Sequence, residues 1–214
     1  MDQWDPLLID SLAAKRPVIL MDIPGVGRSE GKVPTTMAGW ASSVIDLCKA
    51  LGLSEIDCLG FSMGGCNAQM VALNGPSQGL KVRHLILAGT SPSWGQGVKR
   101  NQSAMELEAF GRLAAAQSVE QQREAFLTGF FRMASPRSRK AGEESWKRIV
   151  GSGRKNVMPH VGKEGSKRQG AAFAGFMDPA RTREGSFDRL SGLMIPVLIA
   201  TGKFFFLLLL GGRG

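Results

Sequence analysis

A serine flanked by glycines lies where an apolar segment of this 214-residue chain gives way to a helical pattern. The stretch Leu59-Gly-Phe-Ser-Met-Gly-Gly65 contains a G-x-S-x-G motif centred on Ser62. A serine on a sharp turn between a strand and a helix adopts a strained backbone conformation that presents its hydroxyl to substrate. We expect glycine at Gly60 and Gly64 because side chains there would collide within the turn. The motif predicts nucleophilic attack by Ser62 on a carbonyl carbon.

The helix expected to begin at Met63 supplies a second chemical element. The first N–H groups of a helix have no intrahelical acceptor and lie at its positive end. The Met63 N–H is therefore the expected donor to the oxyanion that forms when Ser62 attacks. An ordinary glycine turn is the alternative, and the strand before the motif and the helix after it favour the nucleophile.

Alternating helices and strands are expected to position this turn. Apolar runs predict strands at Pro17–Met21, Ile56–Phe61, Val82–Ala88 and Ile195–Thr201. Apolar residues at helical spacing predict helices beginning near Trp4, near Met37 and at Met63. This succession predicts an α/β fold, a mostly parallel sheet flanked by helices on both faces.

The segment from Pro92 to Asp188 interrupts the alternation. Helical patterns around Ala104–Ala116 and Val119–Met133, without a strand pattern, predict a helical insertion. The part from Gly151 to Arg183 is rich in Gly, Lys, Arg and Ser, which favours long loops over packed helices.

Charge and composition exclude several classes of protein. The net charge is +9, and 18 basic against 10 acidic residues lie between Ser91 and Arg189. These charges are scattered, without the aromatic-studded strand of an RNA-binding sheet, so we expect no nucleic-acid partner. The three cysteines have no CxxC spacing, which indicates neither a disulfide framework nor a zinc site.

No targeting or membrane signal is visible in the sequence. The start, Met-Asp-Gln-Trp-Asp-Pro, lacks a basic and apolar leader pattern. The longest apolar run, Phe204–Leu210, is too short to cross a bilayer. We expect a cytoplasmic protein without a membrane span, a metal or an organic cofactor.

The chain resembles the α/β-hydrolase superfamily in four stretches that occur in the family's order. The family's D-x-P-G-x-G-x-S turn, its nucleophile elbow and two of its core strands are similar to 22–29, 60–64, 82–89 and 196–202. The resemblance implies a core of residues 1–91 and 189–203, with a helical lid insertion at 92–188. It also implies ester, haloperoxidase-like or C–C-bond hydrolysis. Asp22 is expected to organise its own turn rather than to serve as a catalytic acid.

Parts of the family's site have no counterpart in this sequence. The H-G loop that gives a second oxyanion N–H would precede Trp4, and the catalytic acid and histidine would follow Thr201-Gly202. Residues 204–214 instead form an aberrant apolar tail. We therefore expect a core truncated at both ends, with little or no activity. We also expect direct pairing of the 17–21 and 56–61 strands, because unpaired buried backbone groups would cost about 1–3 kcal/mol each.

The two histidines of the sequence, His84 and His160, are not expected to replace the missing base. His84 begins a strand, about 20 Å from the catalytic edge of the sheet. His160 lies in the basic insertion without an orienting acid.

The function predicted from these residues is that of a serine hydrolase for a small ester-like or other carbonyl substrate. A non-catalytic protein that binds a small ligand, and a basic protein that contacts an anionic surface, remain the alternatives. Exposed sheet edges and the apolar tail favour self-association.

Overall fold

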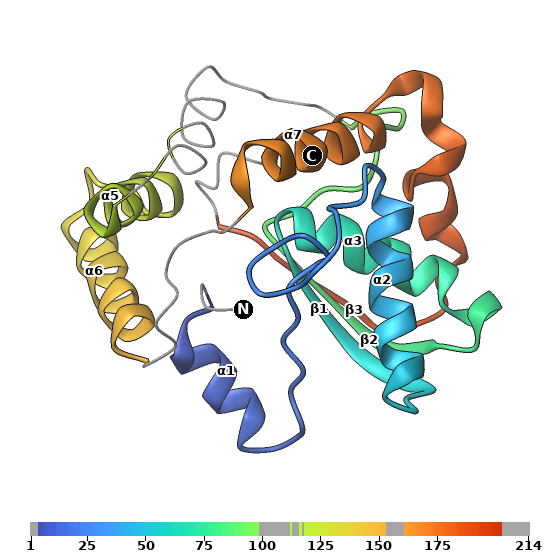
Figure 1. The fold of residues 1–214 in the computed structure, drawn as a ribbon, viewed down its shortest axis with the longest axis horizontal. Coiled ribbons are helices and arrows are strands. Elements are labelled where there is room, and N and C mark those ends of the chain that lie inside the picture. Colours follow the sequence, from blue (N-terminus) through green and yellow to red (C-terminus); the bar gives the residue numbers. More distant parts are fainter. Residues whose placement is uncertain (1–3, 99–111, 113–115, 117, 153–160, 203–214) are drawn as a thin grey trace, which may run out of the picture. The chain divides into compact units, whose positions relative to one another are not determined.

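The computed structural model describes residues 4–98, 112, 116, 118–152 and 161–202 (Figure 1). Its helices are α1 (Pro6–Ala13), α2 (Met37–Ala50), α3 (Met63–Asn74), α5 (Val119–Phe130), α6 (Pro136–Gly151) and α7 (Gly162–Phe176). Its strands are β1 (Glu55–Phe61), β2 (Lys81–Ala88) and β3 (Val197–Ala200). Three short 3₁₀ turns are η1 (Pro76–Gln78), η2 (Pro179–Glu184) and η3 (Phe187–Gly192).

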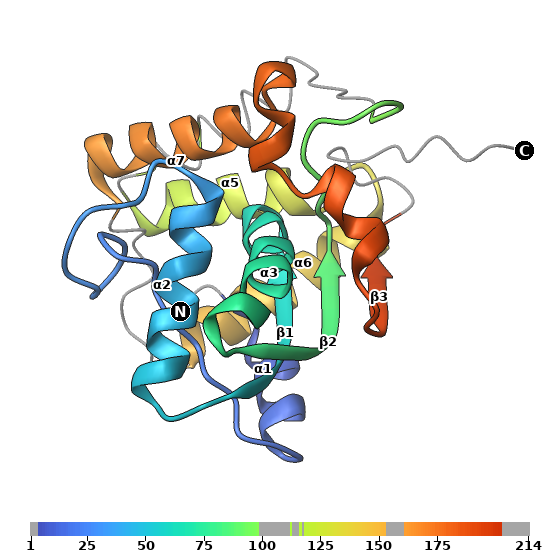
Figure 2. The same ribbon diagram turned by 90° about the vertical axis from the view of Figure 1, so that its right-hand side faces the viewer.

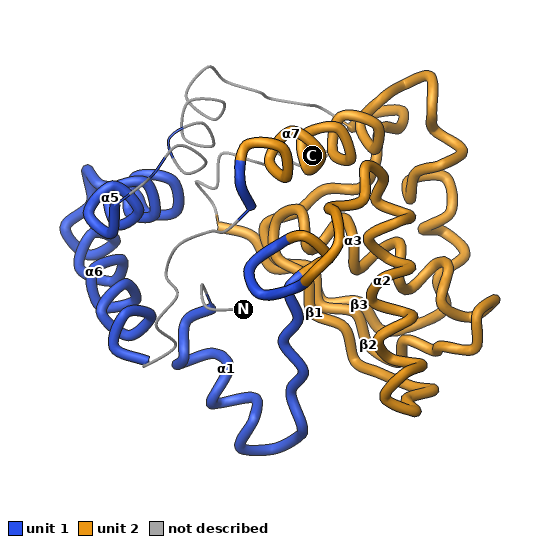
Figure 3. Tube along the Cα trace, in the orientation of Figure 1, with its two compact units in different colours: residues 1–22, 26–29, 102–162 blue, residues 23–25, 30–101, 163–214 orange. Residues whose placement is uncertain are grey.

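The chain is divided into two compact units (Figure 3). Unit 1 comprises residues 1–22, 26–29 and 102–162, and unit 2 comprises residues 23–25, 30–101 and 163–214. Unit 2 contains all three described strands and the G-x-S-x-G turn.

The sheet of unit 2 is parallel, with the described strands in the order β1-β2-β3. Phe61 lies opposite Ala88, and Ala88 lies opposite Ala200, so the carboxyl ends of the strands meet at one edge. Helix α3 packs across β1 and β2, and α2 packs beside α3 (Figure 2). The α/β fold with a parallel sheet flanked by helices is therefore confirmed, and Ser62 follows β1 at the carboxyl edge.

Helix α2 begins after an N-cap residue, Thr36. The Thr36 side chain accepts a hydrogen bond from the Gly39 N–H at 3.0 Å, which caps the helix. The Trp40 indole N–H donates to the Pro34 carbonyl at 2.9 Å, so this large side chain is buried without an unpaired donor. The fully buried side chains of α2, α3 and β2 form the core, among them Ile45, Met70 and Leu85.

The strand expected at Pro17–Met21 is not formed, and its expected pairing with β1 is wrong. Residues 17–23 have no strand pairing among the described residues, and Ile19 is 52% exposed. An extended apolar run becomes a strand only when a neighbouring strand satisfies its N–H and C=O groups. The sequence pattern shows an apolar run but cannot show whether another strand lies beside it. It therefore predicts a strand that does not form.

The expectation of long loops over 151–183 is also wrong in part. Helix α7 occupies 162–176, with Ala172 and Phe176 buried. The Arg168 side chain donates to the Val33 carbonyl at 2.5 Å, and the Phe176 carbonyl accepts from the Trp94 N–H at 3.2 Å. Tertiary contacts within unit 2 thus stabilise a helix whose glycine content gives it a low intrinsic propensity. Helix α6, which the patterns did not single out, occupies 136–151, and the helix expected at 104–116 lies almost entirely outside the described residues.

Unit 1 is held by an aromatic cluster and a partly buried ion pair. Phe126 lies 5.5 Å from Phe130, Phe131 and Trp146, measured between ring centroids, which joins α5 to α6. Asp5, the N-cap of α1, accepts from Arg148 on α6 at 2.8 and 2.7 Å and from the Ser145 hydroxyl at 2.7 Å. This bidentate pair fixes α1 to α6.

Asp5→Asn is expected to destabilise unit 1 in a pH-dependent manner. The Arg148 guanidinium lowers the pKa of Asp5 from 3.8 to about 2, outweighing desolvation, and the Ser145 and Leu7 hydrogen bonds lower it further. Folding therefore favours the carboxylate, and its contribution, reduced by solvent screening to about 1 kcal/mol, is complete above about pH 5. It is lost as the pH falls to about 2. Asparagine still caps α1, so the substitution isolates the ion pair.

The measurement for Asp5→Asn is urea unfolding followed by hydrogen exchange of α6 at pH 7, 4 and 2. Asp46→Asn is the matched control, because Asp46 accepts only an exposed 3.3 Å hydrogen bond from Ser42. A stability difference that stays constant between pH 7 and pH 2 would contradict the role of the Asp5 carboxylate.

Surface features of the described residues bear on partners. Met194, Val197, Leu198 and Ile199, at and just before β3, are all exposed, with Met194 at 92%. None of the described helices combines the length and apolarity needed to cross a bilayer. Self-association through a sheet edge stays a prediction.

Candidate active site

Ser62 has a backbone conformation that serine rarely adopts. Its φ is 54° and its ψ is −124°, and among the described residues no other non-glycine residue has a positive φ. The Ser62 N–H donates to the Ala88 carbonyl at 3.0 Å, and the Gly65 N–H donates to the Ser62 carbonyl at 2.9 Å. The end of β2 and the first turn of α3 thus hold the strained turn in place, as the sequence predicts.

The Ser62 hydroxyl is not used to stabilise its own helix. Serine is a favoured N-cap, but Ser62 makes no side-chain capping bond to α3. Its side chain is half-buried, and the structure gives it no hydrogen bond to another described residue. None of the described residues therefore occupies the Ser62 hydroxyl.

The two glycines of the motif differ in the space around them. A Cβ atom on Gly60 would lie 2.6 Å from the Gly64 carbonyl carbon and 2.6 Å from the Gly65 Cα, and closer still to the Gly64 oxygen. A Cβ atom on Gly64 would meet no described atom within 4 Å. The collision expected at both positions is present at Gly60 and absent at Gly64.

Gly65, rather than Gly64, is the second glycine at a close contact. A Cβ atom there would overlap the Thr90 side chain, 2.6 Å from its hydroxyl oxygen. Thr90 follows β2, so α3 approaches the end of the sheet closely at this residue. The sequence shows a further glycine, Gly65, directly after the motif. Its periodicity does not show that Thr90 is the neighbour that requires glycine there.

The start of α3 can supply the oxyanion donor expected at Met63. Met63 and Gly64 occupy the first two positions of this 12-residue helix, where N–H groups have no intrahelical acceptor. The aligned peptide dipoles make this end of the helix positive. The geometry is suited to stabilising negative charge beside Ser62.

The cysteines are poor competitors as nucleophiles. Burial raises the pKa of Cys66, one turn after Ser62, to about 11, and burial raises the pKa of Cys58 on β1 to about 12. Burial also raises the pKa of Cys48. A thiol attacks as the thiolate, so these groups are unreactive at neutral pH.

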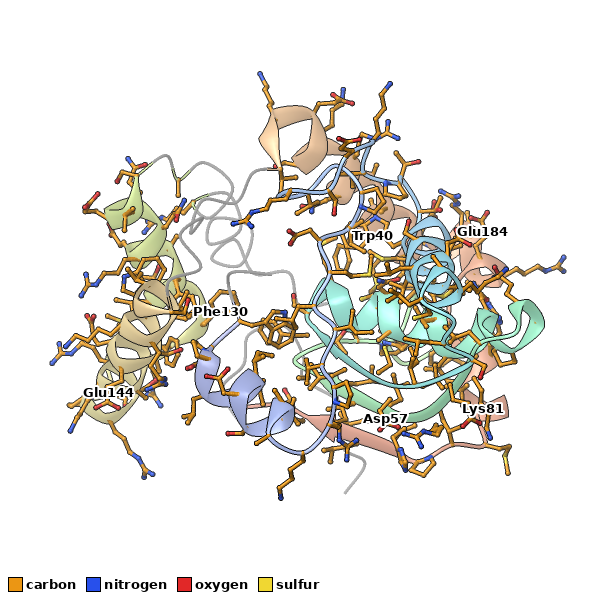
Figure 4. All side chains as sticks on the ribbon, turned by 60° about the horizontal axis from the view of Figure 1, so that its bottom comes forward. Trp40, Asp57, Lys81, Phe130, Glu144 and Glu184 are labelled. Carbon is orange, nitrogen blue, oxygen red and sulfur yellow. The ribbon has the colours of Figure 1, made fainter. Side chains whose placement is uncertain are left out.

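His84 does not begin its strand as expected, because it is the fourth residue of the eight-residue β2. Its Nδ1 is 2.7 Å from an Asp57 carboxylate oxygen, and the Arg83 guanidinium lies 3.2 Å from the other oxygen. A register shift between Ile56 and Asp57 brings Asp57 opposite His84. Figure 4 labels Asp57 of β1 and Lys81, the first residue of β2. Four residues, or about 13 Å of strand, separate His84 from Ala88, so His84 is too far to act on Ser62. His160 lies outside the described residues.

Asp22 belongs to a turn in unit 1. The Ser29 hydroxyl donates to the Asp22 main-chain carbonyl at 2.7 Å, and Gly27, with φ of 60°, lies against the Asp22 carboxylate. These contacts agree with a turn-forming role. Among the described residues, no group of three or more His, Cys, Asp or Glu side chains could hold a metal ion.

Comparisons with known proteins agree with this fold. The family model described as the alpha/beta hydrolase fold matches residues 1–203. The chain therefore belongs to the α/β-hydrolase family. It is 32% identical over 106 residues to a proline iminopeptidase from Heyndrickxia coagulans, a match covering 47% of this chain and 36% of that protein.

Solved structures show the same fold at low sequence identity. An alpha/beta hydrolase fold protein from Chitinophaga pinensis has a TM-score of 0.64 at 23% identity, covering 96% of this chain and 79% of that one. An esterase from Rhodococcus sp. has a TM-score of 0.59 at 21% identity, covering 94% and 67%. The chain thus spans only part of the length of its relatives, about a third in the case of the iminopeptidase.

Proposed function

We propose that this α/β-hydrolase uses Ser62 as a nucleophile toward a small ester-like or other carbonyl substrate. The observation that carries the proposal is the strained Ser62 turn between β1 and α3. Its backbone strain of about 1–3 kcal/mol has no structural purpose that an ordinary glycine turn would not serve better. In the proposed reaction the Ser62 oxygen attacks the carbonyl carbon, and the Met63 N–H stabilises the resulting oxyanion.

The proposed activity of the 214-residue chain is low, because Ser62 has no identified base. Within the described residues the one histidine is His84, which is paired with Asp57 about 13 Å along β2 from Ala88. A serine hydrolase without its base retains only the rate from oxyanion stabilisation and binding, about 10³–10⁴-fold over water. The related esterase and iminopeptidase support acyl chemistry, and they do not select the substrate.

Of the alternatives, a basic surface for an anionic partner has little support in unit 1. Among the described helices, Arg123 pairs with Glu143, Lys140 lies 3.9 Å from Glu144, and Arg148 is bound by Asp5. These contacts neutralise part of the basic excess within the unit. A non-catalytic ligand-binding protein is the alternative that the following experiment separates.

Covalent labelling with a fluorophosphonate probe tests the proposal. We expect slow labelling of the purified chain that is lost in Ser62→Ala and retained in Ser191→Ala, since Ser191 is an exposed serine on η3. Intact-mass spectrometry and peptide mapping measure the rate and the labelled residue. If the folded chain is labelled no faster than Ser62→Ala, the hydrolase proposal fails. Saturable ligand binding unaffected by Ser62→Ala would then favour the non-catalytic protein.

A further inference from the structure

Two buried serines join the places where the 92–188 segment leaves the sheet and returns to it. The Ser93 N–H donates to the Ser186 hydroxyl oxygen at 3.0 Å, and the Ser186 N–H donates to the Ser93 hydroxyl oxygen at 2.9 Å. The Phe187 N–H adds a third bond to the Ser93 oxygen at 3.0 Å. Both serines are 0% exposed. We call this reciprocal pair, Ser93 and Ser186, the serine clasp.

The two chain segments of the serine clasp are packed closely against each other at two glycines. A Cβ atom on Gly185 would overlap the Ser93 side chain, and a Cβ atom on Gly95 would overlap the Phe187 ring. Each of the two chain segments in the clasp therefore contains a glycine, Gly95 or Gly185, that allows the other segment to approach closely. Hydrogen bonds and close packing together make the clasp a defined element of unit 2.

Gln69 on α3 connects the clasp to the nucleophile turn. Because the Ser186 oxygen accepts from Ser93, its own proton is free to be donated to the Gln69 Oε1, 2.7 Å away. This fixes the orientation of the amide, and its Nε2 donates to the Ser91 carbonyl at 2.9 Å and the Gly65 carbonyl at 3.2 Å. Gln69 is 1% exposed, and the structure pairs both ends of its amide.

Gly65 is hydrogen-bonded directly to Ser62. Its N–H donates to the Ser62 carbonyl, while its Cα lies against Thr90 at the end of β2. The chain of contacts therefore runs from the clasp through Gln69 to the first turn of α3. A further contact joins this region to the end of α3, where the Arg189 Nη2 donates to the Asn74 Oδ1 at 2.8 Å.

We infer that Ser186, Ser93 and Gln69 are positioning residues that couple the closed serine clasp to the geometry of the Ser62 turn. When the clasp is closed, the Gln69 amide holds the Gly65 carbonyl, and the Ser62 hydroxyl and Met63 N–H keep their relative orientation. When the clasp opens, Gln69 loses its partner and the first turn of α3 loosens. The catalytic consequence rests on the proposed function, whereas the coupling itself does not.

Amide hydrogen exchange of the full chain tests the coupling without requiring activity. Ser186→Ala and Gln69→Met are compared with Ser77→Ala and Gln78→Met. The controls remove a serine and a glutamine side chain, Ser77 and Gln78, which donate to the Asn74 carbonyl at the exposed end of α3. We expect exchange over residues 62–69 to be about tenfold faster in the first pair than in the controls, the effect of losing one buried hydrogen bond. Faster exchange confined to residues 91–94 and 184–188 would overturn the inference.

Native-state exchange of the unmodified chain in low urea decides the matter if either variant fails to fold. The inference expects the amides of 65–69 to open together with those of Ser93, Ser186 and Phe187, with the same urea dependence. Protection of 65–69 at urea concentrations that open the clasp would overturn it.

Fluorophosphonate labelling adds the catalytic readout. If the unmodified chain is labelled at Ser62, we expect about tenfold slower labelling in Ser186→Ala and Gln69→Met, and unchanged labelling in the two controls. Equal labelling rates in all five proteins would overturn the catalytic consequence. If the unmodified chain is not labelled, the proposed function fails, and the exchange results alone decide the coupling.

Discussion

Gly60→Ala is expected to abolish labelling of Ser62 and to lower the free energy of unfolding of unit 2 by about 1–3 kcal/mol. The added methyl group would lie 2.6 Å from the Gly64 carbonyl carbon and the Gly65 Cα. Both neighbours are backbone atoms, so neither can rotate away as a flexible side chain would. The turn must open to admit the methyl group, which displaces Ser62 from the end of β2.

Gly64→Ala is the matched control for Gly60→Ala. A Cβ atom there meets no described atom within 4 Å, and alanine favours a helix over glycine by about 0.5–1 kcal/mol. We expect unchanged or slightly raised stability, measured by urea unfolding, and a folded Ser62 turn. Equal losses in both variants would show that the spacing of the motif, rather than the contact at Gly60, requires glycine.

Ser62→Gly is expected to stabilise the protein by about 1 kcal/mol while removing all labelling. Serine at φ of 54° and ψ of −124° costs about 1–3 kcal/mol, and glycine adopts this conformation without a Cβ penalty. The greater freedom of glycine in the unfolded chain offsets about 0.5–1 kcal/mol of that gain. Strain of this kind, which lowers stability, is common at functional sites.

Ser62→Ala separates strain from the loss of the hydroxyl. Both substitutions remove the nucleophile, but alanine keeps the Cβ atom and therefore the strain. The check is the difference between their urea midpoints at pH 7, with an unchanged dependence of the unfolding free energy on urea. A Ser62→Gly protein no more stable than Ser62→Ala would mean that the turn stores no strain.

The nucleophile turn and the α/β class follow from local sequence. A strand of apolar residues, glycines around Ser62 and a helical pattern from Met63 are all short-range features, so the motif predicts both the strained residue and its place at the edge of the sheet. The strands at 55–61, 81–88 and 197–200 follow in the same way. Their apolar runs are bounded by turn residues that mark where each strand stops.

Elements that depend on distant partners were not predictable from the same patterns. The run at Pro17–Met21 is apolar and extended, yet no described strand pairs with it. Helix α7 contains four interior glycines or serines and still folds, because its buried face and Arg168 contact other parts of unit 2. Local propensity is weak compared with tertiary contacts of this kind.

The sequence by itself determined the strained conformation of Ser62, because the turn is built from residues adjacent along the chain. Only the tertiary structure decided which glycine is sterically required and which residues support the turn. Gln69 and Ser186 are 117 residues apart along the chain and meet through one hydrogen bond. A buried hydrogen bond between distant polar side chains leaves no periodic signal, since each partner alone resembles an ordinary polar residue.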